Sequence, residues 1–200
     1  ITGTDVRRAF EMYGLHAGYV RGKTTKRTVS RARVDDTLMM EQKEQNMYAD
    51  VMHIDNEKFL ITVSEPLQLT LQTRLERETQ NCLGMALHAH IECIRSRGFI
   101  PKIVYVDPQT AFRTLVGQFP GVVIDVGGAR DYVAKVDNKI RRIKEVYRSV
   151  KAGLSWKLPN SMVRDLVAYA VSRINIRRTT AINVNVCPKV LFTGMKINFK

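Results

Sequence analysis

Three aspartates stand where a carboxylate side chain can bind a metal ion. Asp50 lies between apolar residues inside the β-prone segment 48–54, where a charge is costly to bury unless it is paired or bound to a cation. Asp107 follows the apolar run 103–106, and α/β sheets usually place ligand-contacting groups at such strand ends. Asp137 opens a basic helix. If the first two strands are neighbours and the helix crosses their ends, the three carboxylates meet around one cleft.

Carboxylate oxygens without His or Cys are ligands that suit Mg²⁺ or Mn²⁺. Two such ions about 3.5–4 Å apart can activate a nucleophile and stabilise the leaving oxygen of a phosphodiester. Each aspartate also has a purely structural interpretation. Asp50 suits an edge strand, Asp107 an Asp-Pro turn and Asp137 the N-terminus of a helix, where the dipole favours it. The residue types alone leave both interpretations open.

The segments around Asp50 predict an antiparallel meander of three strands. Residues 48–54 and 59–63 are β-prone runs, and the segment 55–58 between them has turn chemistry at its start, which favours a hairpin. Residues 67–71 alternate apolar and polar side chains and predict a third strand.

Helices and strands alternate in the second part of the chain. Apolar residues at helical spacing, with stop signals such as Gly98, define the helices. The continuous apolar run 103–106 and the buried-looking segment 121–126 define the strands. We predict helices over 77–97, 109–116, 136–151 and 160–174, and strands over 103–106 and 121–126. Strands followed by alternating strands and helices describe a mixed α/β sheet with helices packed on it.

The composition favours a polyanionic partner. The chain has 200 residues, 32 Lys and Arg against 19 Asp and Glu, and a formal net charge of +13, which points chiefly to nucleic acid. A ribosomal or membrane-surface protein is the alternative. No apolar run is long enough to span a membrane and no signal peptide opens the chain, so we expect no membrane association and a soluble, intracellular domain. Three cysteines without a Cys-x-x-Cys pair read as reduced thiols.

The helix predicted over 136–151 carries most of the candidate DNA contacts. Its apolar side can face the core while basic side chains reach outward beside Asp137 and bind phosphates, which positions DNA without reading its sequence. A solvated basic face is the alternative. The candidate DNA-binding residues are Lys135, Lys139, Arg141, Arg142, Lys144, Arg148 and Lys151.

Several segments, in order, resemble the catalytic core of Ty1/copia-type retrotransposon integrases, in the retroviral integrase superfamily. The resemblance covers residues 5–196, and its strength lies in the order and spacing of moderately specific pieces. Asp107 and Asp137 are also separated as the second and third acids of this superfamily are. The matching pieces are 22–27, 50–52, 59–64, 97–99 (Arg97-Gly98-Phe99), 102–107, 136–145, 171–175, 187–188 and 192–194 (Phe192-Thr193-Gly194).

This resemblance implies an RNase H-like fold, with a mixed five-stranded sheet made of an antiparallel meander plus parallel strands and flanked by helices. It implies a basic N-terminal arm over 1–45, a catalytic core over 46–180 and a C-terminal extension over 181–200. The activity it implies is 3′-end processing and DNA strand transfer by a polynucleotidyl transferase. Asp50, Asp107 and Asp137 would hold two Mg²⁺ or Mn²⁺ ions. A homo-oligomer acting on element ends and target DNA in the nucleus is expected on the same basis.

The sequence departs from the family pattern at the third acid, which is usually Glu. The carboxylate of Asp137 is one methylene shorter, so its oxygen falls about 1 Å short, and a misplacement of that size can lower a rate around 10²-fold. Asp125 and Asp131 lie nearby without matching the motif. The zinc-binding region that usually precedes such cores has no counterpart in the sequence. His88 and His90 do not suggest a metal site either, because residues two apart on a helix face different sides.

Two other functions fit the same residues. Another RNase H-like nuclease or a transposase would use the same acids on a different substrate. A catalytically impaired, integrase-derived DNA-binding domain would keep the basic surface and lose the chemistry at Asp137. A basic RNA-binding domain fits less well because no aromatic-interleaved basic strand is present.

Overall fold

A computed structural model describes residues 3, 4, 7, 43–108, 110–127, 130–177 and 186–195. The chain divides into two units, 1–30 and 31–200, and every element named below belongs to the second. The helical spacing of Val6, Phe10 and Tyr13 also predicts a helix over 4–13, of which only Thr4 and Arg7 are described, and both are helical. The basic stretch 22–27 lies outside the described residues.

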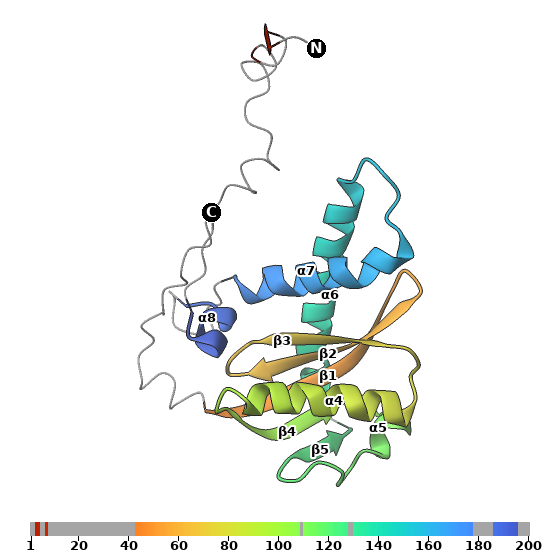
Figure 1. The fold of residues 1–200 in the computed structure, drawn as a ribbon. Coiled ribbons are helices and arrows are strands. Elements are labelled where there is room, and N and C mark those ends of the chain that lie inside the picture. Colours follow the sequence, from red (N-terminus) through yellow and green to blue (C-terminus); the bar gives the residue numbers. More distant parts are fainter. Residues whose placement is uncertain are drawn as a thin grey trace. The chain divides into compact units, whose positions relative to one another are not determined.

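Five strands form one mixed sheet in the order β3-β2-β1-β4-β5 (Figure 1). Strands β1, β2 and β3 pair antiparallel, while β1 with β4 and β4 with β5 pair parallel. This arrangement confirms the predicted meander followed by parallel strands. The strand bounds are β1 Glu44–Ile54, β2 Glu57–Glu65, β3 Thr70–Leu75, β4 Ile100–Val106 and β5 Val123–Val126.

Helices cover both faces of this sheet (Figure 1). One face packs on α4 through a core that includes Met47, Leu60 and Val104. The other face packs on α6 and α7 through Met52, Phe59 and other residues. No helix in the described ranges is both long and apolar enough to cross a membrane. The helix bounds are α4 Gln80–Arg95, α5 Thr110–Arg113, α6 Arg130–Ala152, α7 Val163–Asn175 and α8 Pro188–Thr193, with a 3₁₀ turn, η1, at Asn160–Met162.

Two predicted elements are displaced in the structure, and one helix was not predicted. The third strand is β3 at 70–75 rather than 67–71, because Leu67 and Leu69 are buried by the core while they lie in the connection before the strand. Helix α6 begins at Arg130, so Asp137 lies two turns inside the helix and does not open it. Helix α8 was not predicted.

Two of the family-like segments contact each other across the fold. The ring of Phe192, in α8, stacks on Phe99 with centroids 6.3 Å apart, and the Arg97 guanidinium lies 5.7 Å from the same ring. Gly194 ends α8 with φ 65, a conformation that glycine adopts without a Cβ penalty. Both segments therefore have a structural role, because their contacts pack α8 against the start of β4.

Candidate metal and nucleic-acid site

Strand pairing brings Asp50 and Asp107 together. The parallel register of β1 and β4 ends with Tyr48 opposite Tyr105 and Ala49 opposite Val106, and the next position along each strand is Asp50 and Asp107. Neighbouring strands lie about 4.8 Å apart, and side chains on one face repeat every second residue. The tyrosines stack with ring centroids 5.2 Å apart. Both acids therefore continue the face that the tyrosines mark.

That face is the one covered by α6, which carries Asp137. Tyr48 belongs to the core packed on α6, and Val136 of α6 lies in the same core. The pKa of Asp50 is raised by burial first, and then by the negative charges of Asp137 and Asp107. A hydrogen bond from the Val51 N–H, 2.7 Å long, opposes this shift. The charges of Asp137 and Asp107 therefore both act on Asp50.

This donor set fits a divalent cation. Two carboxylates, Asp107 and Asp137, repel the charge of the half-buried Asp50, and a bound Mg²⁺ or Mn²⁺ would relieve this repulsion. Carboxylate oxygens are also the hard ligands that these ions prefer. Within the described ranges, no three acidic, His or Cys side chains are close enough together to ligate one ion. Binding of one ion by all three carboxylates would therefore require them to move closer to one another. Asp125 is exposed on β5 and is not among the charges that shift the pKa of Asp50.

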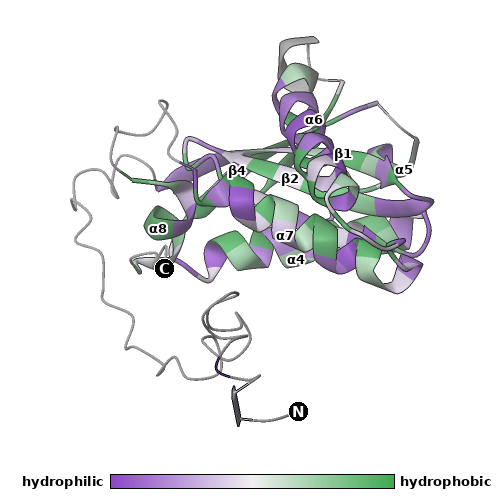
Figure 2. Cartoon of the chain, turned by 90° about the horizontal axis from the view of Figure 1, so that it is seen from above, coloured by the Kyte–Doolittle hydropathy of each residue, from purple (hydrophilic) through white to green (hydrophobic). Residues whose placement is uncertain are grey.

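The predicted DNA-binding residues divide into two groups. Lys135 donates to Glu65 and Lys151 to Asp55, so both lysines bind carboxylates of the β1–β2 hairpin. The remaining five also lie on α6, without a hydrogen bond or ion pair to a carboxylate of the hairpin in the described part of the chain, and this helix is coloured mainly as hydrophilic in Figure 2. Among them, Arg141, Arg142 and Arg148 are exposed, whereas Lys139 and Lys144 are half-buried.

Lys139 differs electrostatically from a surface lysine. Burial lowers the pKa of Lys139, and the positive charge of Arg142 lowers it further, while Glu65 raises it. A DNA phosphate beside this ammonium would favour its charged form. Lys139 is two residues beyond Asp137 on α6, so the two side chains leave the helix on different sides.

The two histidines on α4 have structural surroundings. His90 is buried with Nδ1 2.7 Å from Thr62 Oγ1 and Nε2 3.0 Å from Thr73 Oγ1, so a metal ion would have to displace these hydroxyls. His88 is exposed and lies beside the Phe119 ring, with centroids 6.2 Å apart. A cavity of about 850 Å³ next to His88 and Phe119 is on the α4 side, and none of the three acids lines it.

Several residues that shape the site were not identified from the sequence. Glu65 and Asp55, the partners of two predicted DNA-binding lysines, were not singled out, and neither was the Tyr48–Tyr105 stack. The alternation of side chains along β1 does place Tyr48 on the face of Asp50, so Tyr48 could have been identified from the sequence. Glu65 and Asp55 could not, because no local pattern marks a carboxylate that binds a lysine 70 or 96 positions away.

Solved structures resemble this arrangement, although no protein-family model and no curated protein matches the sequence. The catalytic core domain of BIV integrase matches with a TM-score of 0.56 and 14% identity, over 74% of this chain and 92% of that one. A chain of the simian T-cell lymphotropic virus intasome, in complex with the PP2A regulatory subunit B56 gamma, matches with a TM-score of 0.60 and 14% identity, over 96% of this chain and 68% of that one.

The fold is that of a retroviral integrase catalytic core. It confirms the predicted RNase H-like α/β class, with its five-stranded mixed sheet and flanking helices. At 14% identity the likeness is one of fold. On this integrase-core fold, Asp50 comes from β1, Asp107 from the end of β4 and Asp137 from α6.

Proposed function

We propose that this chain is an integrase-type polynucleotidyl transferase that processes the 3′ ends of DNA and joins them to target DNA. The observation that carries the proposal is the strand register that sets Asp50 beside Asp107 on the face of the sheet covered by α6, the helix that carries Asp137. The negative charges of Asp137 and Asp107 also raise the pKa of Asp50, and perturbed carboxyl groups are typical of functional sites. The integrase-core fold supports this chemistry over the purely structural interpretations of the three aspartates.

Asp50 and Asp107 would hold one Mg²⁺ or Mn²⁺, and Asp50 and Asp137 a second. When bound, these ions supply activation of the attacking oxygen and stabilisation of the leaving oxygen. Asp50 is central because it belongs to both pairs and because the Val51 N–H orients its carboxylate. Asp50 is partly buried on the sheet face, which reduces the screening of its charge by water and strengthens its attraction for a cation.

The exposed side of α6 would hold the DNA backbone. Arg141, Arg142 and Arg148 are exposed along the helix, and Lys139 and Lys144 are half-buried beside them. Phosphate contacts from such residues position the duplex without reading its sequence, and each contact removed should reduce the salt dependence of binding by about one unit of slope. Element ends and target DNA as substrates, a homo-oligomer and action in the nucleus belong to this proposal. The Ty1/copia type rests on the sequence pieces described above.

A catalytically impaired DNA-binding domain is the second candidate. The observation that favours it is Asp137 itself, whose carboxylate is one methylene shorter than the usual glutamate and is exposed on α6. Such a chain would keep its basic surface and its affinity for DNA while joining ends slowly or not at all.

A strand-transfer assay with a labelled donor-end duplex and Mg²⁺ or Mn²⁺ tests the proposal. We expect metal-dependent joining by the parent chain, no joining by Asp50→Asn, and unchanged joining by Asp165→Asn, which neutralises an exposed aspartate on α7. If the parent binds DNA without joining it and Asp137→Glu restores joining, the second candidate holds. If neither the parent nor Asp137→Glu joins or binds DNA, both fail.

A further inference from the structure

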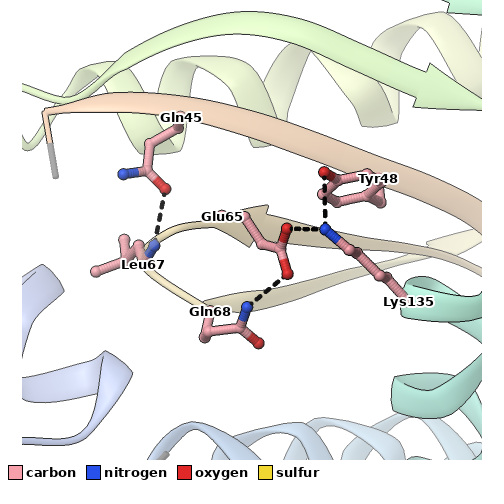
Figure 3. A network of polar contacts seen from close by, with 6 residues as sticks. All are labelled: Gln45, Tyr48, Glu65, Leu67, Gln68 and Lys135. Carbon is pink, nitrogen blue, oxygen red and sulfur yellow. Dashed lines mark hydrogen bonds and ion pairs between the residues drawn. The ribbon is translucent and has the colours of Figure 1, made fainter. Parts of the chain in front are cut away.

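A rigid turn at the end of β2 presents a carboxylate toward α6 (Figure 3). Gln68 Nε2 donates to Glu65 Oε1 at 2.7 Å, which fixes the orientation of the carboxylate. Gln45, fully buried on β1, accepts a 3.1 Å hydrogen bond from the Leu67 N–H and ties the turn to the sheet. The other oxygen of Glu65, Oε2, faces α6.

Lys135 of α6 binds this carboxylate (Figure 3). Its Nζ donates to Glu65 Oε2 and to the Tyr48 hydroxyl, the latter at 3.3 Å. The same ammonium lies 4.8 Å from the centre of the Tyr48 ring, within cation–π range. Three contacts thus converge on one lysine, and a DNA phosphate would have to break them to recruit it.

The position of Lys135 in the chain makes these contacts relevant to the acids. Lys135 precedes Asp137 by two residues on α6, and Tyr48 precedes Asp50 by two residues on the same face of β1. The network therefore joins the two elements within one helical turn of the acids that must meet across them.

A second anchor holds the far end of the same helix. Asp55, in the β1–β2 turn, accepts a 2.6 Å hydrogen bond from the Tyr147 hydroxyl and an ion pair from Lys151. Lys135 and Lys151 are 16 residues apart, about 24 Å along the helix axis. Two anchors at this spacing oppose both sliding and tilting of α6 over the sheet.

We propose that Lys135 is a positioning residue, which through Glu65 and Tyr48 sets the place of Asp137 relative to Asp50, and that it is not a DNA contact. This inference rests on the proposed function, because the consequence of misplacing Asp137 is weaker metal binding. Groups that orient metal ligands typically contribute 10–100-fold to metal affinity or activity. We expect Lys135→Met to weaken Mn²⁺ binding on the order of tenfold, and Lys135→Arg, which keeps the charge and the ring contact, to restore most of the affinity.

The matched control is Lys102→Met. Lys102 forms an ordinary lysine–glutamate ion pair with Glu44, 3.0 Å long, at the start of β4 and away from the acids. Mn²⁺ affinity is measured by electron paramagnetic resonance, DNA affinity by fluorescence anisotropy of a labelled duplex, and local order by hydrogen exchange of the amides at 134–141. Denaturation in urea shows whether the variants remain folded.

Three results together support the proposal: in Lys135→Met, Mn²⁺ affinity falls, exchange at 134–141 accelerates, and DNA affinity stays at the level of Lys102→Met. Unchanged Mn²⁺ affinity, or an equal loss in Lys102→Met, overturns it, as does a selective loss of DNA affinity. If the parent binds no Mn²⁺, the proposed function fails. Faster exchange confined to Lys135→Met then still supports the anchoring of α6, and unchanged exchange overturns that as well.

Discussion

Mild acid should destabilise this fold through one buried histidine. The His90 side chain on α4 is only 4% exposed, and its two ring nitrogens lie against the hydroxyls of Thr62 and Thr73. Burial lowers the pKa of His90 from 6.5 to about 4 because the charged ring would lose its hydration. The ring is therefore neutral in the folded protein well below the pH at which it ionises in the unfolded chain.

The direction of the effect follows from proton binding. Between about pH 6.5 and pH 4, the unfolded chain binds a proton at His90 that the folded protein does not, so the free energy of unfolding falls as the pH falls through this window. The loss is about 2 kcal/mol at pH 5 and approaches about 3 kcal/mol below pH 4. Above pH 7 the contribution of His90 to the pH dependence vanishes.

Urea denaturation at pH 8, 7, 6 and 5 measures this loss, with His90→Gln as the test variant and His88→Gln as the control on the exposed side of α4. Glutamine keeps a polar group near the threonines without titrating. The difference between pH 7 and pH 5 should shrink in His90→Gln and persist in His88→Gln. The reasoning is refuted if the parent chain loses no more stability over this range than His90→Gln does.

Three substitutions test other parts of the fold. Asp50→Asn should stabilise the protein at neutral pH by about 0.5–2 kcal/mol in urea denaturation: the pKa of Asp50 is raised, so ionisation costs stability as the pH rises through the folded pKa. Asn175→Ala should destabilise it by about 2–3 kcal/mol, because the Asn175 amide makes 2.9 and 2.7 Å hydrogen bonds with the N–H and C=O of Thr70 on the edge strand β3. Tyr147→Phe should cost about 1–2 kcal/mol through loss of the 2.6 Å hydrogen bond to Asp55, visible as a lower unfolding temperature.

Each substitution has a matched control at an exposed position. Asp165→Asn, Asn138→Ala and Tyr169→Phe make the same chemical changes on the outer sides of α7 and α6. Changes at such positions usually alter stability by less than about 0.5 kcal/mol. Equal effects in a substitution and its control would show that the named contact contributes nothing.

Much of the fold follows from periodicity in the sequence. The steps of three and four between Leu83, Leu87, Ile91 and Ile94 predict α4, and all four side chains are fully buried in the core. The continuous apolar run at 103–106 predicts a strand covered on both faces, as β4 is. Local patterns were sufficient here because each element carries its own burial pattern.

The remaining features depend on contacts between distant residues. Leu67 and Leu69 alternate like a strand, yet the core buries them in a connection, so alternation alone misplaced β3. Lys135 and Lys151 resemble free basic residues until the hairpin carboxylates lie beside them. Helix α8 did carry local signals, Pro188 at its start and Gly194 at its end, which mark even a six-residue helix.

The candidate site was predicted in residue type but not in geometry. Asp50 and Asp107 could be selected because they interrupt or end an apolar segment, and Asp137 because its segment matches the third acid of the family. The register that sets Asp50 beside Asp107 cannot be predicted from the sequence of either strand alone. A slip of the pairing by one residue would turn Asp107 to the other face of the sheet. The pairing of β1 with β4, in which Tyr48 lies opposite Tyr105, fixes it.

The order of the strands also determines when the acids meet during folding. Strands β1, β2 and β3 are joined by short connections, whereas β1 pairs with β4 only after a much longer stretch of chain, including α4, has been closed. Non-local pairing of this kind forms slowly. The three negative charges are therefore brought together late, after most of the meander has formed. A divalent ion that binds only the assembled acids should consequently slow unfolding and leave the folding rate nearly unchanged.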